Sequence, residues 1–314
     1  MPGPTRPVAA PEGPTTRVYA PNAGNTAGPG PPALSITWRE VRRTRGVGWR
    51  GGRRLPRGRS GTGRSRIVLV MELFGTVADL YERARPGYPP EIAESIRAYH
   101  GGAPASVAEV GAGTGKGTEV LARLGAPLTC VEPDALMAAR LAERFPDARV
   151  EATTFERWSP PTGRVDVLAC AMAWHWLDAA TRNTLARRAL APGGTLAVFG
   201  HRYDYADADQ QAAVRAALRS VDPTVRERPV DWFHRDVLDS GQFDDVRREV
   251  FRRELPLDKE RYLALMRTFG PYLSRTPERQ RRGIAALDRL VDDFGGTVVL
   301  DLRTTLVLGR ADAR

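Results

Sequence analysis

A glycine-rich loop, Glu109-Val-Gly-Ala-Gly-Thr-Gly115, follows an apolar run and precedes a helical pattern. Glycines permit a tight turn and a close approach of backbone to ligand, beside the exposed amides of a helix N-terminus. The loop fails the phosphate-loop pattern, because Val110 replaces the first glycine and Gly117 replaces the final Ser or Thr. Lys116 occupies the third glycine position of the dinucleotide fingerprint, so that pattern fails as well. A glycine-rich turn without a ligand remains an alternative for the loop taken alone.

Two carboxylates accompany this loop and narrow the choice of ligand. Glu132 ends the next apolar run, 21 residues after Gly111, where a carboxylate can accept both ribose hydroxyls of an adenosine. Glu109 precedes the first glycine and places a second acid in the expected crevice. An acid there would repel a pyrophosphate but suits a ligand that carries an ammonium and a sulfonium. The pair therefore indicates a cationic adenosine cofactor.

Strand and helix patterns alternate from about residue 89 onward, which is typical of βαβ units. Strands are expected over 106–110, 128–131, 149–152, 165–171 and 195–199, a charged strand near an edge over 246–255, and a last strand over 297–308. Helices are expected over 89–99, 118–124, 135–145, 179–189, 207–221, 258–268 and 277–294. The pattern predicts a parallel sheet covered by helices on both faces. Helical stretches inserted before the last strand would form a lid over the carboxyl edge of the sheet.

With these motifs in view, the chain resembles the class I S-adenosylmethionine-dependent methyltransferases. The resemblance lies in the glycine loop and in Val131-Glu132-Pro133. It is greater for the subgroup that includes trans-aconitate methyltransferases, through Phe74-Gly75, Tyr81, Arg85-Pro86-Gly87-Tyr88-Pro89, Thr154-Phe155-Glu156-Arg157-Trp158 and Ala173-Trp174-His175-Trp176. The specific motifs cover about residues 71–200, and a weaker likeness continues to Ala311. The expected fold is α/β, a Rossmann-like doubly wound sheet of seven strands, mostly parallel with an antiparallel last strand, and a helical lid insertion.

The resemblance implies a set of residues that bind S-adenosylmethionine. Its glycines would hold the amino-acid part of the cofactor, and the acid that ends the second strand would hold the ribose. The complete expected set is Tyr81, Arg85, Glu109, Gly111, Gly113, Gly115, Glu132, Pro133, Thr154, Phe155 and Ala171. Thr154 and Phe155 would lie along the adenine, while Tyr81 and Arg85 would meet the cofactor's carboxylate, or alternatively belong to a segment that only packs on the domain. Ala152-Thr153 departs from the family, which leaves open which side chain recognises the adenine amino group.

His175 and Trp176, which follow the fourth strand, are the expected catalytic residues. Methyl transfer requires an aligned nucleophile and the exclusion of water. A carboxylate acceptor needs no base, whereas a phenol or alcohol usually does, and His175 could serve as that base or hydrogen-bond the acceptor. A packed aromatic cluster is the structural alternative for both residues. His201, and Arg267 in the expected lid, are weaker candidates for contact with the acceptor.

The net charge of +10 resides in the first 70 residues, which hold thirteen Arg and two acids, so the remaining 244 residues sum to −1. This Arg/Pro/Gly-rich segment is expected to be disordered. It could be an arm for nucleic acid or a transit peptide. We favour a start of translation at or near Met71, with a methyltransferase domain over residues 71–314.

The remaining composition indicates a cytoplasmic protein. Cys130 and Cys170 lie in apolar runs, which is typical of a reducing compartment, and no stretch is apolar enough to span a membrane. No metal site is expected. The expected partner is a small-molecule substrate, and nucleic acid is not expected; the oligomeric state stays open. Two alternatives are a nucleic-acid-associated methyltransferase that uses the basic arm and a domain that binds the cofactor without turnover.

Overall fold

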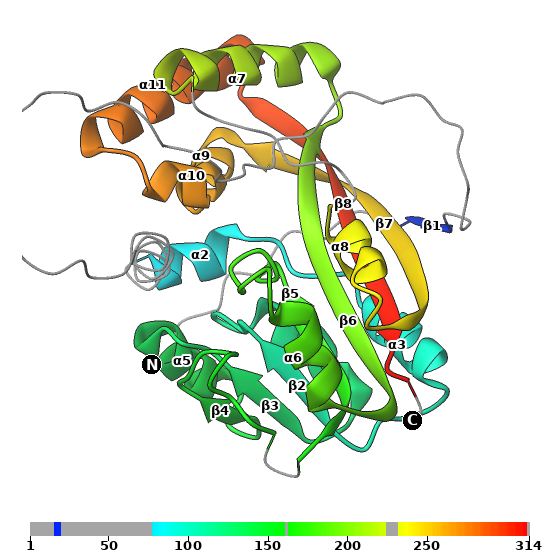
Figure 1. The fold of residues 1–314 in the computed structure, drawn as a ribbon. Coiled ribbons are helices and arrows are strands. Elements are labelled where there is room, and N and C mark those ends of the chain that lie inside the picture. The colour runs from blue at the N-terminus through cyan, green and yellow to red at the C-terminus, as the bar shows by residue number, and fades with distance from the viewer. Residues whose placement is uncertain (1–15, 20–76, 161–162, 224–231, 313–314) are drawn as a thin grey trace, which may run out of the picture.

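A computed structural model of the chain describes residues 16–19, 77–160, 163–223 and 232–312. Its strands form one sheet in the order β1-β7-β8-β6-β5-β2-β3-β4 (Figure 1). Five neighbouring strands run parallel: β2 (Val107–Val110), β3 (Leu128–Val131), β4 (Arg149–Glu151), β5 (Val165–Ala171) and β6 (Leu190–Tyr205). β8 (Thr297–Arg310) lies antiparallel between β6 and β7 (Asp244–Asp258). Strands β2 to β8 thus confirm the predicted Rossmann-like sheet with an antiparallel last strand.

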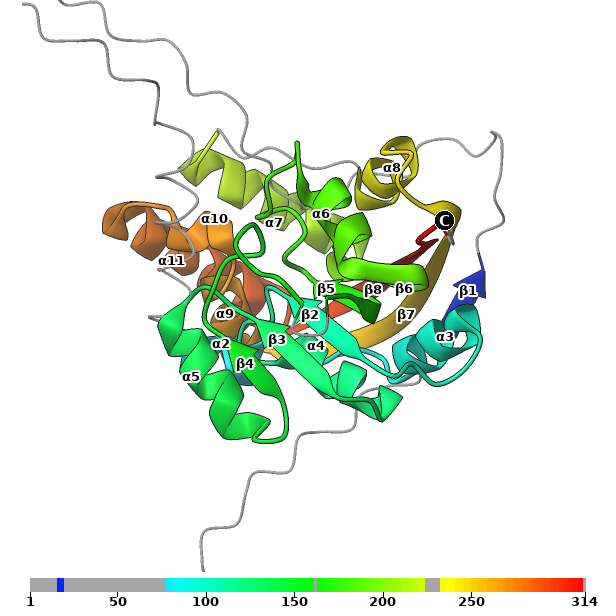
Figure 2. The same cartoon turned by 60° about the horizontal axis from the view of Figure 1, so that its bottom comes forward.

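Helices cover both faces of this sheet (Figure 2). Side chains of β6 alternate between the two resulting cores: Leu196 and Val198 pack into one, and Ala197 and Phe199 into the other. The first core includes residues of α6 and α8, and the second includes residues of α3, α4 and α5. These helices are α3 (Glu91–His100), α4 (Lys116–Leu121), α5 (Ala135–Arg144), α6 (Arg182–Ala189) and α8 (Trp232–Asp239).

A helical lid lies above the carboxyl ends of the parallel strands (Figure 1). It consists of α7 (Ala208–Val221), α9 (Lys259–Arg267), α10 (Gly270–Leu273) and α11 (Pro277–Asp293). A third core joins α7, α9 and α11 to the distal ends of β6, β7 and β8, and Tyr262, Leu287 and Val291 are buried within it. Helix α2 (Ala78–Ala84) lies between the lid and the sheet. The insertion of α9, α10 and α11 before the last strand confirms the predicted lid.

β6 is much longer than the strand expected over residues 195–199. It pairs with β8 from Thr195 to Tyr205, so the sheet continues past the level at which the other parallel strands end. Phe199, His201, Tyr203 and Tyr205 occupy every second position and therefore point toward the same side of the strand. This extension of β6 supports the lid and forms one wall of the cavity described below.

The first 70 residues lie almost entirely outside the described part of the chain. Thr16–Tyr19 is the exception: it forms β1, antiparallel to β7, which differs from the disorder expected for these four residues. The expected start near Met71 and the Phe74-Gly75 motif lie outside the described residues. Within the ranges that the structure describes, none of the helices is both long and apolar enough to cross a bilayer.

Candidate functional site

The glycine loop connects β2 to α4 and holds three glycines with positive φ. These values are 68° at Gly111, 58° at Gly113 and 95° at Gly115. A Cβ added to Gly111 would lie 2.3 Å from the Cβ of Ala173, and one added to Gly115 would lie 2.4 Å from the ring of Phe145. At Gly113 the nearest atom would be Met137 Sδ at 3.9 Å. Gly111 and Gly115 therefore permit close packing, whereas Gly113 leaves space for a ligand to approach the backbone.

Glu132 lies at the carboxyl end of β3 and faces this loop. Its Oε2 accepts a hydrogen bond from the Gly113 amide (2.8 Å), and its Oε1 accepts one from the Asp134 amide (2.9 Å). The side chain is buried, and this desolvation raises the pKa of Glu132 to about 7. Each carboxylate oxygen accepts one backbone hydrogen bond and retains capacity for another. The geometry fits a ligand that donates two hydroxyl groups.

Glu109 is buried beneath the start of α4. Its Oε2 accepts a hydrogen bond from Thr118 Oγ1 at 2.5 Å, while its Oε1 has no hydrogen-bond partner among the described residues. A Cβ on Gly117 would lie 2.1 Å from that Oε1. Burial raises the pKa of Glu109 to about 8. The carboxyl thus lies under the loop, packed against α4, whereas the sequence placed it in the crevice above.

Helix α2 is held against the glycine loop by Glu82. This carboxylate accepts a hydrogen bond from Thr114 Oγ1 (2.8 Å) and forms ion pairs with Lys116 (3.0 Å) and Arg144 (2.9 Å). Tyr81 of α2 and Arg85, which directly follows this helix, line a cavity between the sheet and the lid. The structure therefore brings this segment to the site by anchoring Glu82, a residue that sequence reasoning missed.

Arg85 is a buried cation whose polar contacts are with uncharged groups. Its Nε donates to Thr268 Oγ1 (2.8 Å), its Nη2 to the Thr268 carbonyl (3.0 Å) and its Nη1 to the Tyr203 hydroxyl (3.2 Å). The guanidinium carbon also lies 4.2 Å from the ring centroid of Phe269. Among the described residues, no carboxylate forms an ion pair with Arg85. One N–H on each terminal nitrogen is left to bind an anion.

A cavity of about 230 Å3 lies between the ends of β5 and β6 and the lid. Aromatic side chains from four parts of the chain line it: the loop after β5, the distal half of β6, α8 and the segment around α10. Tyr262, buried in α9, also lines it, and its hydroxyl lies 2.6 Å from that of Tyr205. Arg267, in contrast, is not among the residues that line this cavity.

The structure brings His175 and Trp176 to the wall of this cavity. Both are half-buried, and their ring centroids are 4.5 Å apart. Trp174 also contacts the cavity, although it is almost fully buried in the core. The loop that holds them turns sharply, because Met172 has a φ of 56°. A non-glycine residue in this left-handed region is strained, and such positions concentrate at functional sites.

His201 lines the same cavity but lacks the properties of a base. Burial, together with the neighbouring Arg253 and Arg85, lowers the pKa of His201 to about 3. Its Nδ1 lies 2.8 Å from Thr304 Oγ1, and its ring stacks on Tyr88 at 4.3 Å between centroids. A general base is most effective when its pKa lies near the working pH. The geometry therefore supports a structural role for this ring.

The remaining residues of the expected set lie around the ends of the strands. Pro133 follows Glu132, and half-buried Ala171 ends β5 beside Gly117. Thr154 is exposed, whereas Phe155 is buried and lies 6.3 Å from Trp158 between ring centroids. Phe155 thus packs into the core, and Thr154 is the more accessible of the two for contact with an adenine.

Sequence reasoning missed the aromatic residues of the lid wall. Tyr203, Tyr205, Phe269, Trp232 and Phe233 line the cavity. The alternation Phe199, His201, Tyr203, Tyr205 was a usable signal, since every second residue of a strand shares one face. Trp232 and Phe233 carried no comparable signal, because they follow a segment without periodicity. Among the described residues, no group of three or more His, Cys, Asp or Glu could hold a metal ion.

The strand order defines the class of the fold and site. β2 and β5 are adjacent, and the connections from them lead to opposite sides of the sheet, which makes a topological switch point. Open α/β sheets bind their ligands at the carboxyl ends of the strands beside such a point. The glycine loop, Glu132 and the loop after β5 all lie there. This is the arrangement of Rossmann-like domains that bind nucleoside-containing ligands.

Comparisons with known proteins specify this class further. Residues 107–194 match the family model described as a methyltransferase domain. An uncharacterized methyltransferase of Mycobacterium tuberculosis is 34% identical over 131 residues, which cover 42% of this chain and 53% of that protein. A trans-aconitate 2-methyltransferase of Rhizobium meliloti is 41% identical over 95 residues, which cover 29% of this chain and 36% of that protein. The chain thus spans about half or less of the length of these relatives.

The fold has a counterpart among solved structures. A proposed type II methyltransferase from Anaeromyxobacter dehalogenans superposes with a TM-score of 0.57 at 18% identity, covering 73% of this chain and 99% of that one. Residues 107–194 thus match a methyltransferase domain in sequence, and the described residues share the fold of a solved methyltransferase structure. The resemblance predicted from the sequence is confirmed.

Proposed function

We propose that this chain transfers a methyl group from S-adenosylmethionine to a carboxylate or hydroxyl oxygen of a small molecule. One observation carries the proposal: Gly111 of the glycine loop packs directly on Ala173, the residue before the wall of the cavity. The expected cofactor site and a cavity for an acceptor therefore adjoin at the end of β5. Methyl transfer requires this adjacency, because the donor and acceptor atoms must be held in line.

The residues around the loop suit the cofactor. The Glu132 carboxylate, fixed by two backbone amides, has capacity for the two ribose hydroxyls. Gly113 leaves space for the amino-acid part of the cofactor, while Gly111 and Gly115 fix the loop. Pro133 and Ala171 border the site. Thr154 would lie beside the adenine. Arg85, with Tyr81 beside it, has two N–H groups for the carboxylate of the cofactor.

The loop after β5 would serve the acceptor. When bound, the cofactor supplies a sulfonium-activated methyl group, which an acceptor oxygen takes as the carbon–sulfur bond breaks and its electron pair passes to sulfur. A hydroxyl acceptor must also lose its proton, and His175 lies in the cavity wall where it could take that proton. A carboxylate acceptor needs no base. Trp176 and the lid exclude water from the cavity.

Titration calorimetry with S-adenosylmethionine tests the cofactor site. The wild-type protein is expected to bind, and Glu132→Ala to weaken binding about 100-fold, because two charge-assisted hydrogen bonds are lost. Glu143→Ala is the matched control, since this glutamate is exposed on α5. A folded wild-type protein that shows no binding, or a Glu132→Ala variant that binds normally, would refute the proposed site. Turnover is then measured with radiolabelled methyl donor and a panel of acceptors.

A further inference from the structure

The walls of the cavity under the lid are strongly apolar and aromatic. Among the described residues, those that line it include no Asp, Glu or Lys. Its aromatic lining consists of Tyr81, Trp174, Trp176, Phe199, Tyr203, Tyr205, Trp232, Phe233, Tyr262, Phe269 and Tyr272. An apolar cavity of about 150 Å3 holds benzene, so the volume of about 230 Å3 gives room for a two-ring molecule.

Among the described residues of the lining, the groups that could balance an anionic acceptor are few: Arg85, Arg275, His175 and His201. Arg275 is buried and already paired with Asp222, at 3.2 Å between Nε and Oδ2. His201 is neutral, since its pKa is lowered to about 3. Arg85 is the one guanidinium of the lining with no ion pair to a described carboxylate, and the cofactor's carboxylate competes for it. A second or third carboxylate on an acceptor would therefore be buried without a counter-charge, which is strongly unfavourable.

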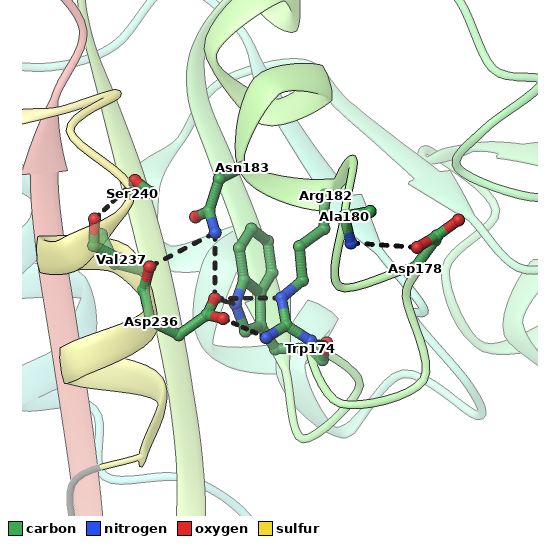
Figure 3. A network of polar contacts seen from close by, with 8 residues as sticks. All are labelled: Trp174, Asp178, Ala180, Arg182, Asn183, Asp236, Val237 and Ser240. Carbon is green, nitrogen blue, oxygen red and sulfur yellow. Dashed lines mark hydrogen bonds and ion pairs between the residues drawn. The ribbon is translucent and has the colours of Figure 1, made fainter.

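The aromatic walls are held in place by a buried polar network (Figure 3). Asp236 of α8 accepts hydrogen bonds from Trp174 Nε1 (2.8 Å) and Arg182 Nε (2.9 Å), and also pairs with Arg182 Nη2. Arg182 Nη1 in turn donates to the Trp174 carbonyl (3.1 Å). The network joins the loop that holds His175 and Trp176 to the helix that holds Trp232. Walls fixed in this way do not have to be ordered when a ligand binds.

From these observations we infer that the acceptor is an aromatic molecule of one or two rings with at most one ionised group, such as a phenol or an aromatic monocarboxylic acid. The described part of the same lining disfavours a small polycarboxylate. This inference rests on the proposed function, because it identifies the acceptor of the same site. It separates this chain from the relatives that are named for trans-aconitate, although 95 residues of one such relative are 41% identical to this chain.

The test compares three probe ligands by calorimetry, with and without S-adenosylhomocysteine: 2-naphthol, 2-naphthoate and trans-aconitate. At least one naphthyl probe is expected to bind more than tenfold more tightly than trans-aconitate. Tryptophan emission is expected to change on binding, because Trp174, Trp176 and Trp232 line the cavity. Equal or tighter binding of trans-aconitate, or no binding of either naphthyl probe, would overturn the inference. Failure of the proposed function itself would give a different result, because S-adenosylhomocysteine, the product formed from the cofactor, would then not bind.

A pair of variants on α8 locates the bound probe. Trp232→Ala removes part of the wall and is expected to weaken naphthyl binding about tenfold, with the affinity for S-adenosylhomocysteine unchanged within twofold. Leu238→Ala is the matched control, because Leu238 is 49% exposed on the same helix and does not line the cavity. Unchanged cofactor affinity also shows that the variant is folded. Equal naphthyl binding by both variants would contradict the assignment of the cavity.

Discussion

Gly111, Gly113 and Gly115 share a left-handed backbone but contribute to the site in different ways. The amide of Gly111 donates to the carbonyl of Val131 (2.8 Å), and its missing Cβ admits Ala173. The missing Cβ of Gly115 admits Phe145. Only Gly113 of the three faces open space. The loop is thus fixed at its two ends by packing, and its middle is available to the ligand.

Substitution of Gly111 should cost more than backbone strain alone. Gly125→Ala provides the reference, because Gly125 has a φ of 73° but no neighbour within 4 Å of an added Cβ. It is expected to lower the free energy of unfolding by about 1 kcal/mol. Gly111→Ala adds a clash with Ala173, and a further loss of about 1–3 kcal/mol is expected. Urea denaturation of both variants measures the difference, and equal losses would contradict the packing role.

Glu109 should make the protein less stable as the pH rises. Its pKa is about 8 when folded, above its ordinary value of 4.5, so the folded state binds the proton more tightly than the unfolded chain. The resulting stability is fully present below about pH 4.5 and is lost as the pH rises through 8. Glu109→Gln, which cannot ionise, is expected to gain Tm relative to wild type between pH 6 and 9. A constant difference in Tm across that range would contradict the shifted pKa.

The position of Glu132 could be predicted from its spacing to the glycine loop. The Glu109 carboxylate was predicted to face the crevice, and this was wrong, because it lies under the loop. An acid that ends a strand beside a glycine loop lies at the strand's carboxyl end whatever the rest of the fold does. Glu109, however, shares a strand face with Val107, which packs against the side of the sheet covered by α3 and α4. That alternation directs the carboxyl beneath the helix that follows the loop.

At the scale of elements, local pattern predicted seven of the helices and the parallel strands, but it gave no helix at α2, α8 or α10 and too short a β6. Gly200 and the charged residues Arg202 and Asp204 interrupt the apolar run and indicate a strand end. In the structure, Asp204 pairs with Arg202 of the same strand at 2.7 Å and with Arg303 of β8 at 3.6 Å, and the backbone of the extension pairs with β8 as far as Tyr205. The strand that supports the extension is thus about a hundred residues away in the sequence, and a local pattern carries no information about it.

The network around Asp236 is an equally long-range feature and can be tested by a double-mutant cycle. Asp236→Ala leaves the guanidinium of Arg182 buried without its carboxylate, since that side chain is only 7% exposed. A loss of about 3 kcal/mol in the free energy of unfolding is expected. Arg182→Met is expected to cost a similar amount, and the double variant less than the sum of the two.

Asp239→Ala is the control for this cycle, because Asp239 is exposed on the same helix. It is expected to change the free energy of unfolding by less than about 0.5 kcal/mol. Tryptophan emission should shift to the red in the Asp236→Ala variant, because the indole of Trp174 loses its hydrogen bond and its fixed surroundings. Additive losses in the cycle would show that Asp236 and Arg182 act independently.

For the whole molecule, the strand order places β1, the described part of the basic N-terminal segment, far from the glycine loop. β1 pairs with β7 at one edge of the sheet, and β7, β8, β6 and β5 all lie between it and β2. The surplus positive charge belongs to residues 1–70, while the remaining 244 residues sum to −1.

Deletion of residues 1–70 distinguishes an arm that serves catalysis from one that does not. The affinity for S-adenosylmethionine is expected to change by less than twofold, because every residue assigned to the cofactor lies in the retained part of the chain. Retention on immobilised heparin is expected to fall sharply, since the net charge drops from +10 to −1. Methylation of an accepted small molecule should be unchanged in the truncated protein. If turnover were lost while cofactor affinity was retained, the N-terminal segment would have to take part in binding or presenting the acceptor, and the alternative of a nucleic-acid-associated enzyme would gain support.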